Sequence, residues 1–446
     1  ASPLVYFLFL GIMNSNNRYN KIMLDIKFIR ENKDTIKETI KNKNINLDLD
    51  RLLELDERRR ELIQESEEIR NKQKKIGREN IDEAKKLKEE YQKMKEALEK
   101  VEKEFNQLML LVPNTYSPET PVGADESFNQ EIYRWGEPKK FNFPIKNHLE
   151  LGQELDLIDT EKGVKVSGFR GYYLKNEAVL LQMALIWHIL LKLQSKGFQL
   201  VIPPTLVREF VLIGSGHFPE GKEDIYQVAN PGKLESGEKI SEPMFLAGTS
   251  EPSLLAYFAH QTLEEKNLPI KLAGFSQCYR SEVGSYGKDT KGLYRLHEFM
   301  KVEQVIFCQA DLEIAHHLFE ELRQNAQEIL EELELPYRVL KICTGDMGAG
   351  KYEMYDLEAW MPSRDKYGET HSDSNLTDWQ ARRLKIKYKT STGEKKYVYT
   401  LNNTGIASPR ILIAILENYQ QPDGSILIPK ILQKYIGKEK IEKPAR

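Results

Sequence analysis

Apolar residues recur at helical spacing through the first third of the chain. Between Leu52 and about Leu111 the composition shifts to Leu, Glu, Lys and Arg, with no proline and a single glycine. Apolar positions repeat every seven residues in the first half and alternate spacings of three and four in the second. Because such heptads pack helix against helix, they predict two long helices in an antiparallel hairpin. The positions are Leu55, Leu62, Ile69 and Ile76, then Ala84, Leu87, Tyr91, Met94, Leu98, Val101, Phe105 and Leu108.

The predicted hairpin turns at Gly77 to Asp82, where the glycine can end one helix and Asn80 or Asp82 can cap the next. About 28 residues per helix give an arm of about 40 Å. The arm is electrically balanced overall, but basic residues gather near the turn, which indicates contact with a phosphate backbone. The alternative is a dimerisation or spacer hairpin whose charges are its solvated face. The clustered residues are Arg70, Lys72, Lys74, Lys75 and Arg78.

The pattern changes after Val112, where a segment rich in proline and glycine breaks the helix. We therefore expect an arm over 23–112, a linker over 113–130 and a second domain over 131–440. In that domain, Asn176 to Lys196 predicts a long apolar helix, and the next segment predicts a strand that ends at Pro203 and Pro204.

Residues 274–304 predict a long antiparallel hairpin, because two extended segments flank a loop rich in Gly, Ser, Asp and Lys. Side chains two apart on a strand share a face, so Arg280 and Glu282 point one way, and Phe299 and Glu303 share a face on the returning strand. A cavity lined by both pairs suits a zwitterionic, phosphorylated ligand with an aromatic base. The alternative is an ordinary hairpin with surface ion pairs.

Two other segments carry candidate chemistry. Thr249 and Glu251 would project to one side of an extended loop and offer a hydroxyl and a carboxylate to an ammonium group, although Thr-x-Glu is also a helix-capping pattern. Ser408 predicts an N-cap and Pro409 a first helical residue. Arg410 then lies in the first turn, where the helix dipole disfavours a cation, so this helix start predicts an anion site.

Composition narrows the function. Charged residues make up 30% of the chain but the net charge is −3, so nucleic-acid contact must come from local patches. Cys278, Cys308 and Cys343 are too few for a disulfide framework or a four-ligand zinc site, which favours a cytoplasmic protein without zinc.

The apolar run at the start of the chain is too short to span a bilayer, so no membrane association is expected. We interpret residues 1–22 as an extension ahead of a native start near Met13 or Met23. A targeting segment is the alternative.

The candidate segments together resemble the class II aminoacyl-tRNA synthetases, and specifically the seryl-tRNA synthetases. Arg280-Ser281-Glu282, the loop Gly287 to Gly292 and Phe299-Met300-Lys301-Val302-Glu303 are similar to motif 2. The helix and strand over 176–204 resemble motif 1, and 397–421 resembles motif 3. The run from Glu369 to Arg383 also matches the family. The resemblance covers nearly the whole chain from about Met23.

The resemblance implies an α+β fold with an antiparallel-sheet catalytic domain, preceded by a coiled-coil arm that grips tRNA. It also implies a homodimer that forms seryl-adenylate from L-serine and ATP with Mg²⁺, and then charges tRNA(Ser) and, in some members, tRNA(Sec). Arg280 and Arg410 would be catalytic. The resemblance implies that serine contacts Thr249, Ser250, Glu251, Glu303, Asn402 and Thr404. It implies that Mg²⁺ contacts Glu369 and Ser372, and that ATP contacts Arg280, Ser281, Glu282, Phe299, Glu369, Thr370, His371, Ser372 and Arg410. It also implies that tRNA contacts the basic arm tip, Lys288 and Lys291.

This chain departs from the family pattern at a few positions. His371 and Asp373 replace a serine and a cysteine, and we interpret the isolated histidine as a tolerated variation rather than a metal ligand. Asn403 and Thr404 replace a glycine and a serine, and the extra methyl of Thr404 bears on discrimination against threonine. Two alternative functions remain: a paralogue that loads an amino acid onto a carrier protein, and a non-catalytic coiled-coil RNA-binding protein.

Overall fold

The structure is a computed structural model that describes residues 25–75, 80–230, 232–233, 236–283 and 292–443. The predicted extension over 1–22, Ile76 to Glu79 at the arm turn, and the loop over 284–291 lie outside these residues. The chain divides into two compact units, with the boundary between Asn114 and Thr115.

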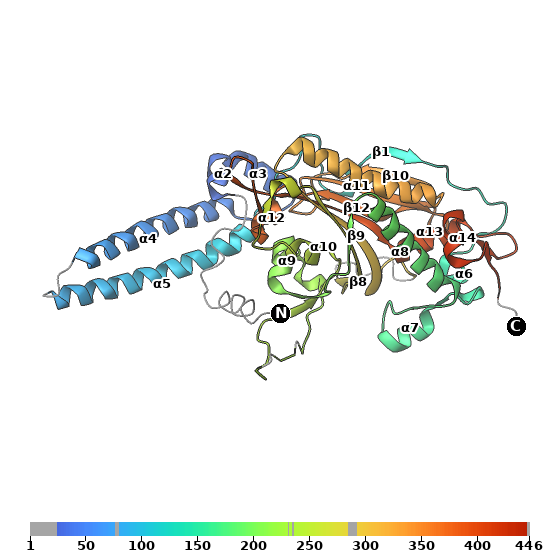
Figure 1. The fold of residues 1–446 in the computed structure, drawn as a ribbon, viewed down its shortest axis with the longest axis horizontal. Helices are drawn as coiled ribbons and strands as arrows, with labels where there is room; N and C mark the ends of the chain where they lie inside the picture. The colour runs from blue at the N-terminus through green and yellow to red at the C-terminus, as the bar shows by residue number, and fades with distance from the viewer. Residues whose placement is uncertain (1–24, 76–79, 231, 234–235, 284–291, 444–446) are drawn as a thin grey trace. The chain divides into compact units, whose positions relative to one another are not determined.

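The first unit is helical (Figure 1). The short helices α2 (Ile26–Glu31) and α3 (Lys33–Asn42) precede α4 (Leu49–Lys75) and α5 (Ile81–Leu111). Arg51 pairs with Glu104 at 2.8 Å and Arg59 with Glu102 at 3.2 Å, so α4 and α5 run antiparallel, as predicted. The heptad residues Leu55, Leu62 and Ile69 are buried between the helices.

The second unit is built on an eight-stranded sheet in the order β1-β10-β11-β12-β15-β9-β8-β4. Neighbouring strands are antiparallel except β4 and β8, which run parallel. This confirms the α+β class with an antiparallel sheet. The strands are β1 (Gln130–Trp135), β4 (Gln199–Val201), β8 (Ile270–Tyr279), β9 (Glu298–Cys308), β10 (Tyr337–Lys341), β11 (Glu353–Met361), β12 (Lys366–Asn375) and β15 (Tyr399–Ala407).

Helices cover both faces of this sheet, which is why β9 is buried along nearly its whole length. Val302 and Ile306 pack into the main core under α8 (Glu177–Ser195), α11 (Leu312–Glu332) and α13 (Ser408–Asn418) (Figure 1). Val305 and Phe307 face the other way, into a second core. That second core includes residues of α10 (Glu251–Ala256) and α12 (Trp379–Leu384).

Shorter elements complete the unit. The helices are α6 (His148–Glu154), α7 (Thr160–Ser167), α9 (Glu209–Ser215) and α14 (Lys430–Ile436), with 3-10 turns η1 (Glu126–Phe128), η2 (Glu220–Asp224), η3 (Glu265–Asn267) and η5 (Pro362–Arg364). The small strands are β2 (Ile158–Asp159), β3 (Tyr173–Leu174), β5 (Leu206–Arg208), β6 (Met244–Leu246), β7 (Thr262–Glu264), β13 (Lys387–Lys389), β14 (Lys395–Tyr397), β16 (Ile426–Leu427) and β17 (Lys440–Ile441).

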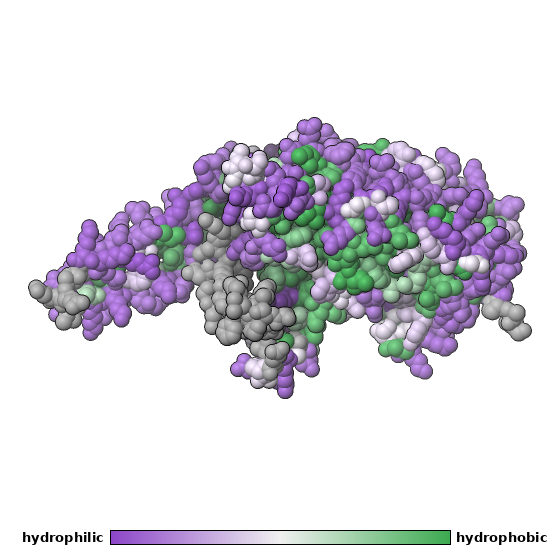
Figure 2. Space-filling model, viewed as in Figure 1, coloured by the Kyte–Doolittle hydropathy of each residue, from purple (hydrophilic) through white to green (hydrophobic). Residues whose placement is uncertain are grey.

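The apolar helix α8 is long and apolar enough to cross a membrane by length and composition, but more than half of it is buried in the protein core. Its outer side keeps an apolar stripe that is exposed, and Figure 2 shows apolar surface gathered over this helix. The stripe consists of Val179, Leu180, Met183, Trp187 and Leu191.

Three local predictions were wrong. Glu251 does not lie in an extended loop but begins α10. Ser408 is not the N-cap of α13: Ala407 occupies that position, and the Ser408 hydroxyl donates to Gln182 Oε1 at 2.9 Å in the core. Strand β8 ends at Tyr279, and Glu282 adopts a left-handed backbone with φ of 55°, so the alternation expected for Arg280 and Glu282 does not hold.

Candidate active site

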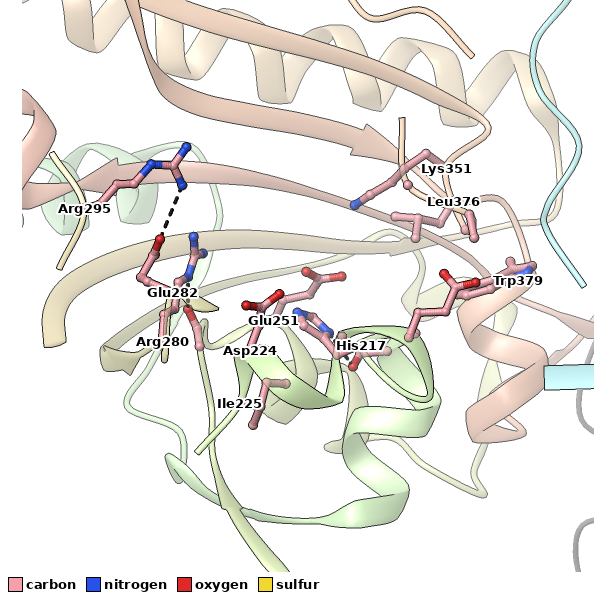
Figure 3. A pocket seen from close by; sticks show the side chains of 18 residues that line it. His217, Asp224, Ile225, Glu251, Arg280, Glu282, Arg295, Lys351, Leu376 and Trp379 are labelled. Atoms are coloured by element: carbon pink, nitrogen blue, oxygen red, sulfur yellow. Dashed lines mark hydrogen bonds and ion pairs between the residues drawn. The ribbon is translucent and has the colours of Figure 1, made fainter. Parts of the chain in front are cut away.

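A cavity of about 610 Å³ opens where α9, η2 and α10 face the ends of the central strands (Figure 3). Carboxylates and cations both line it. Glu251, Asp224 and Glu282 supply negative charge, while Arg280 and Lys351 supply positive charge. Mixed charge at close quarters suits a zwitterion better than a simple anion or cation.

Glu251 lies at the wall of this cavity with its Oε1 fixed by two amides. Gln380 Nε2 donates to it at 2.7 Å and Asn402 Nδ2 at 3.1 Å. Burial alone would raise the pKa of Glu251, but the charges of Lys351 and His217 outweigh burial and the pKa is lowered. Glu251 is therefore an ionised carboxylate held in one orientation, able to bind an ammonium group.

Glu303 is more deeply buried than Glu251. Its Oε2 accepts a hydrogen bond from Thr249 Oγ1 at 3.3 Å and contacts the Lys301 ammonium. Burial raises the pKa of Glu303 despite that cation. Thr404 is directly opposite Glu303 in the register of β9 and β15. The structure thus brings Thr249, Glu251, Glu303, Asn402 and Thr404 into one cluster, as the sequence predicted.

Arg280 and Glu282 border both this cavity and a smaller one of about 50 Å³. The Arg280 Nε donates to the Gly248 carbonyl at 3.2 Å, and its guanidinium lies 5.3 Å from the centre of the Phe299 ring. The Glu282 carboxylate is 3.3 Å from Arg295 Nη1 and 3.5 Å from Arg170 Nη1. Arg280 is therefore placed to reach ligands in both cavities.

The smaller cavity is lined by Phe299, Thr370, Glu369 and Arg410. Arg410 Nη1 donates to the Glu369 carbonyl at 3.0 Å and lies 3.1 Å from the Glu369 carboxylate. Burial would raise the pKa of Glu369, but Arg410 outweighs it and the pKa is lowered. At the start of α13, where the sequence predicts an anion site, Arg410 is paired with an ionised carboxylate.

Asp356 is an acid that the sequence analysis did not single out. It lies opposite Ser372 in the register of β11 and β12, and burial and the Glu369 charge raise its pKa well above the usual range. Its Oδ1 is buried, and no hydrogen-bond donor reaches it among the residues that the structure describes. Glu369, Ser372 and Asp356 together form an oxygen-rich group of the kind that a hard divalent cation prefers.

Four other predicted residues use their side chains within the protein. The Ser250 hydroxyl donates to the Gly274 carbonyl at 3.1 Å, and the Ser281 hydroxyl donates to the Glu223 carbonyl at 2.7 Å. Thr370 Oγ1 donates to the Leu357 carbonyl at 3.1 Å, and His371 Nδ1 lies 2.9 Å from that hydroxyl. His371 is fully buried, and burial lowers its pKa to about 4, so its ring is neutral.

Sequence reasoning missed several residues that line the larger cavity, among them His217, Lys351 and Trp379. His217 Nδ1 lies 2.9 Å from Ser215 Oγ, and burial lowers its pKa. The one indication in the sequence was the glycine beside His217. Gly216 has φ of 88°, and a Cβ there would lie 2.3 Å from the Trp379 ring. Only the fold reveals that this glycine and Trp379 meet.

At the end of α4, Arg70, Lys72, Lys74 and Lys75 are exposed, and the Arg70 guanidinium lies 5.1 Å from the centre of the Tyr91 ring. Arg78, Lys288 and Lys291 lie outside the described residues. Across the described part of the chain, no group of three or more His, Cys, Asp or Glu side chains converges as a metal site.

Both units match known families. Residues 23–116 match the seryl-tRNA synthetase N-terminal domain, and residues 233–419 match the class II tRNA synthetase core domain shared by the G, H, P, S and T enzymes. Among solved structures, the seryl-tRNA synthetase of Pyrococcus horikoshii complexed with ATP superposes with a TM-score of 0.85 at 37% identity, covering 95% of this chain and all of that one. The cytoplasmic serine–tRNA ligase of Naegleria fowleri in complex with AMP gives 0.84 at 29% identity, covering 96% of this chain and all of that one.

Curated relatives match over nearly their full length. The serine–tRNA ligase of Borrelia garinii subsp. bavariensis is 44% identical over 430 residues, which cover 93% of this chain and 98% of the relative. That of Deinococcus radiodurans is also 44% identical, over 95% of this chain and all of the relative. Fold, site geometry and full-length similarity agree, and the chain belongs to the seryl-tRNA synthetases of class II.

Proposed function

We propose that the chain is a serine–tRNA ligase that activates L-serine with ATP and transfers it to tRNA(Ser). The observation that carries the proposal is the adjoining pair of cavities bordered by Arg280, with Glu251 at one end and Arg410 at the other. The full-length similarity to serine–tRNA ligases favours neither a carrier-protein ligase nor a non-catalytic RNA-binding protein.

Serine binds where the two cavities adjoin, beside Arg280. Its ammonium binds the Glu251 carboxylate and the Thr249 hydroxyl, which are held by Gln380, Asn402 and Glu303. Its hydroxyl binds between Glu303 and Thr404, which face each other across β9 and β15. Its carboxylate lies toward Arg280, whose positive charge stabilises the negative charges of this carboxylate and of the α-phosphate.

ATP binds bent over the sheet across both cavities, with its adenine on the Phe299 ring and its γ-phosphate toward Arg410. The serine carboxylate attacks the α-phosphorus in line, the bond to the bridging oxygen breaks, and pyrophosphate leaves. Catalysis comes from positioning and charge neutralisation, so no side-chain nucleophile is required. The terminal ribose hydroxyl of tRNA then attacks the mixed anhydride, and AMP leaves.

Mg²⁺ fits the oxygen-rich group described above. Glu369 and Ser372 would hold the ion with Asp356 behind them, and bound Mg²⁺ would neutralise charge on the phosphate oxygens. Glu369 is already ionised, and a bound cation would favour the ionised form of Asp356, whose Oδ1 has no hydrogen-bond partner among the described residues.

We propose two properties of the assembly. The exposed apolar stripe on α8 mediates a homodimer, since a contiguous apolar face on a single chain marks an interface. The arm binds tRNA through the exposed basic residues at the end of α4, where Arg70, Lys72, Lys74 and Lys75 occur without an acid between them. Three free, buried cysteines favour the cytoplasm as its compartment.

Serine-dependent exchange of labelled pyrophosphate into ATP tests the proposal. We expect exchange with serine, and much less with threonine or alanine, without tRNA. Arg280→Ala should lower exchange by at least about 100-fold, because a charged contact to the reacting phosphate is lost. Arg134→Ala, which removes an exposed arginine paired with Glu131, is the matched control and should change little. Full exchange by Arg280→Ala would refute the role of Arg280.

A further inference from the structure

The Tyr294 ring contacts two guanidinium groups. The Cζ atom of Arg410 lies 4.6 Å from the ring centre and that of Arg364 lies 4.3 Å from it. Both distances are inside the range of about 6 Å over which a cation is attracted to an aromatic face. The Tyr294 carbonyl also accepts a hydrogen bond from Arg410 Nε at 3.3 Å. One residue therefore contacts Arg410 through both its ring and its backbone.

The other contacts of Arg410 involve Glu369, through the carbonyl at 3.0 Å and the carboxylate at 3.1 Å. Both of these contacts are made by Nη1, whereas the Tyr294 ring lies 4.6 Å from Cζ. A bound nucleotide competes for the Glu369 carboxylate, because that carboxylate is the proposed metal ligand. The Tyr294 ring and carbonyl are not metal ligands in this proposal, so we expect both contacts to remain when ATP binds.

We propose that Tyr294 is a positioning residue that holds the Arg410 guanidinium toward the terminal phosphates of ATP. The proposal rests on the role given above to Arg410. Tyr294 lines the smaller cavity, but it acts through Arg410 rather than on the substrate. An arginine side chain has several rotatable bonds, and a ring packed beside its guanidinium removes much of that freedom before ATP arrives.

The proposal predicts that Tyr294 matters for nucleotides with terminal phosphates and not for AMP. In titration calorimetry, Tyr294→Leu should weaken binding of ATP with Mg²⁺ by about tenfold, the size of one partly desolvated cation–π contact, and change AMP binding less than about twofold. Tyr294→Phe keeps the ring and should stay within about twofold of the unaltered chain for both. In pyrophosphate exchange, Tyr294→Leu should raise KM for ATP but not for serine.

The chain offers a matched control, Tyr367, on strand β12. The Tyr367 ring also has two arginines over it, Arg134 at 5.3 Å and Arg338 at 5.2 Å, but it lines neither cavity. Tyr367→Leu should leave ATP binding unchanged even if it lowers thermal stability. A double-mutant cycle of Tyr294→Leu with Arg410→Lys should be strongly non-additive, because both changes remove one contact.

Three results would overturn the proposal. Equal weakening of ATP and AMP by Tyr294→Leu would mean that Tyr294 contacts the nucleoside itself. Unchanged ATP affinity would mean that the ring does not restrain Arg410. Additive effects in the cycle would mean that the two residues act separately. Because nucleotide binding is measured directly, a lack of serine-dependent exchange in the unaltered chain would refute the proposed function and leave the Tyr294 comparison interpretable.

Discussion

Two buried carboxylates in the candidate serine site have pKa values that move in opposite directions. That of Glu251 is lowered by Lys351 and His217, while that of Glu303 is raised by burial. An ionised Glu251 suits an ammonium partner. Glu303, with a Lys301 contact and a threonine hydroxyl, suits a neutral hydroxyl partner. Two glutamates are therefore adapted by their surroundings to bind two different groups of serine, the ammonium and the hydroxyl.

Glu251→Gln should raise KM for serine by about 10- to 100-fold, because a charged hydrogen bond to the ammonium becomes a neutral one. The fold should persist, since Gln380 and Asn402 still find an oxygen at that position. Pyrophosphate exchange over a range of serine concentrations measures the effect, and KM for ATP serves as the internal control. An unchanged KM for serine would contradict the assignment of Glu251 to the ammonium.

At the scale of elements, one histidine links three segments of the second unit. His148, at the start of α6, lies with Nδ1 2.8 Å from Glu417 Oε1 on α13. Its Nε2 accepts a hydrogen bond from the Leu293 backbone at 3.1 Å, which fixes the tautomer with the proton on Nδ1. Leu293 leads directly into Tyr294, so this contact ties the returning strand of the hairpin to the helix that carries Arg410.

Glu417 makes this link sensitive to acid. Burial would raise its pKa, but hydrogen bonds from His148 and Ser363 outweigh burial and lower it. Its stabilising contribution is therefore full above the unfolded pKa of about 4.3 and is lost as the pH falls toward the folded value. Glu417→Gln should cost about 1–3 kcal/mol at pH 7 and flatten the loss of stability between about pH 5 and pH 3. Urea unfolding across this range measures both, and parallel pH profiles for the two proteins would contradict the linkage.

The arm should act on tRNA and not on serine activation. Replacing Arg70, Lys72 and Lys74 with glutamine should raise KM for tRNA and lower the salt dependence of binding by about 0.7–0.9 per lost phosphate contact. The matched control replaces Lys95, Lys100 and Lys103, which are exposed on α5 farther from the turn. Pyrophosphate exchange should be normal in both variants. If the two triple replacements weaken tRNA binding equally, tRNA affinity depends on the total charge of the arm and not on the basic residues near its turn.

For the whole molecule, the α8 stripe predicts the assembly state. Met183→Glu places a charge in the middle of the stripe and should convert a dimer of 51.8 kDa chains into monomers, because an unpaired charge in an apolar interface is costly. Ile314→Glu, at a similarly exposed apolar position on α11, should leave the dimer intact. Sedimentation velocity distinguishes the two states, and an unaltered chain that sediments as a monomer would refute the proposed interface.

The sequence alone determined the features that depend on residues close together along the chain. Heptads specify the pairing of α4 with α5, because an apolar stripe must be covered wherever it occurs. The segments around Arg280, Phe299 and Arg410 could be recognised because each is a continuous run of residues. The start of α13 was misjudged by one residue, since a core glutamine, Gln182, competes for the Ser408 hydroxyl.

Tertiary structure decided what those segments meet. Glu251 is held by Gln380 and Asn402, which lie 129 and 151 residues further along the chain. His217, Lys351 and Asp356 enter the site through the sheet order and the loops around it, and periodicity carries no information about such encounters. Charges separated widely in sequence set the pKa of Glu251, and the approach of Tyr294 to Arg410 follows from the packing of the segment before β9 against α13. Local pattern fixes which elements form, whereas long-range packing fixes which side chains share a cavity.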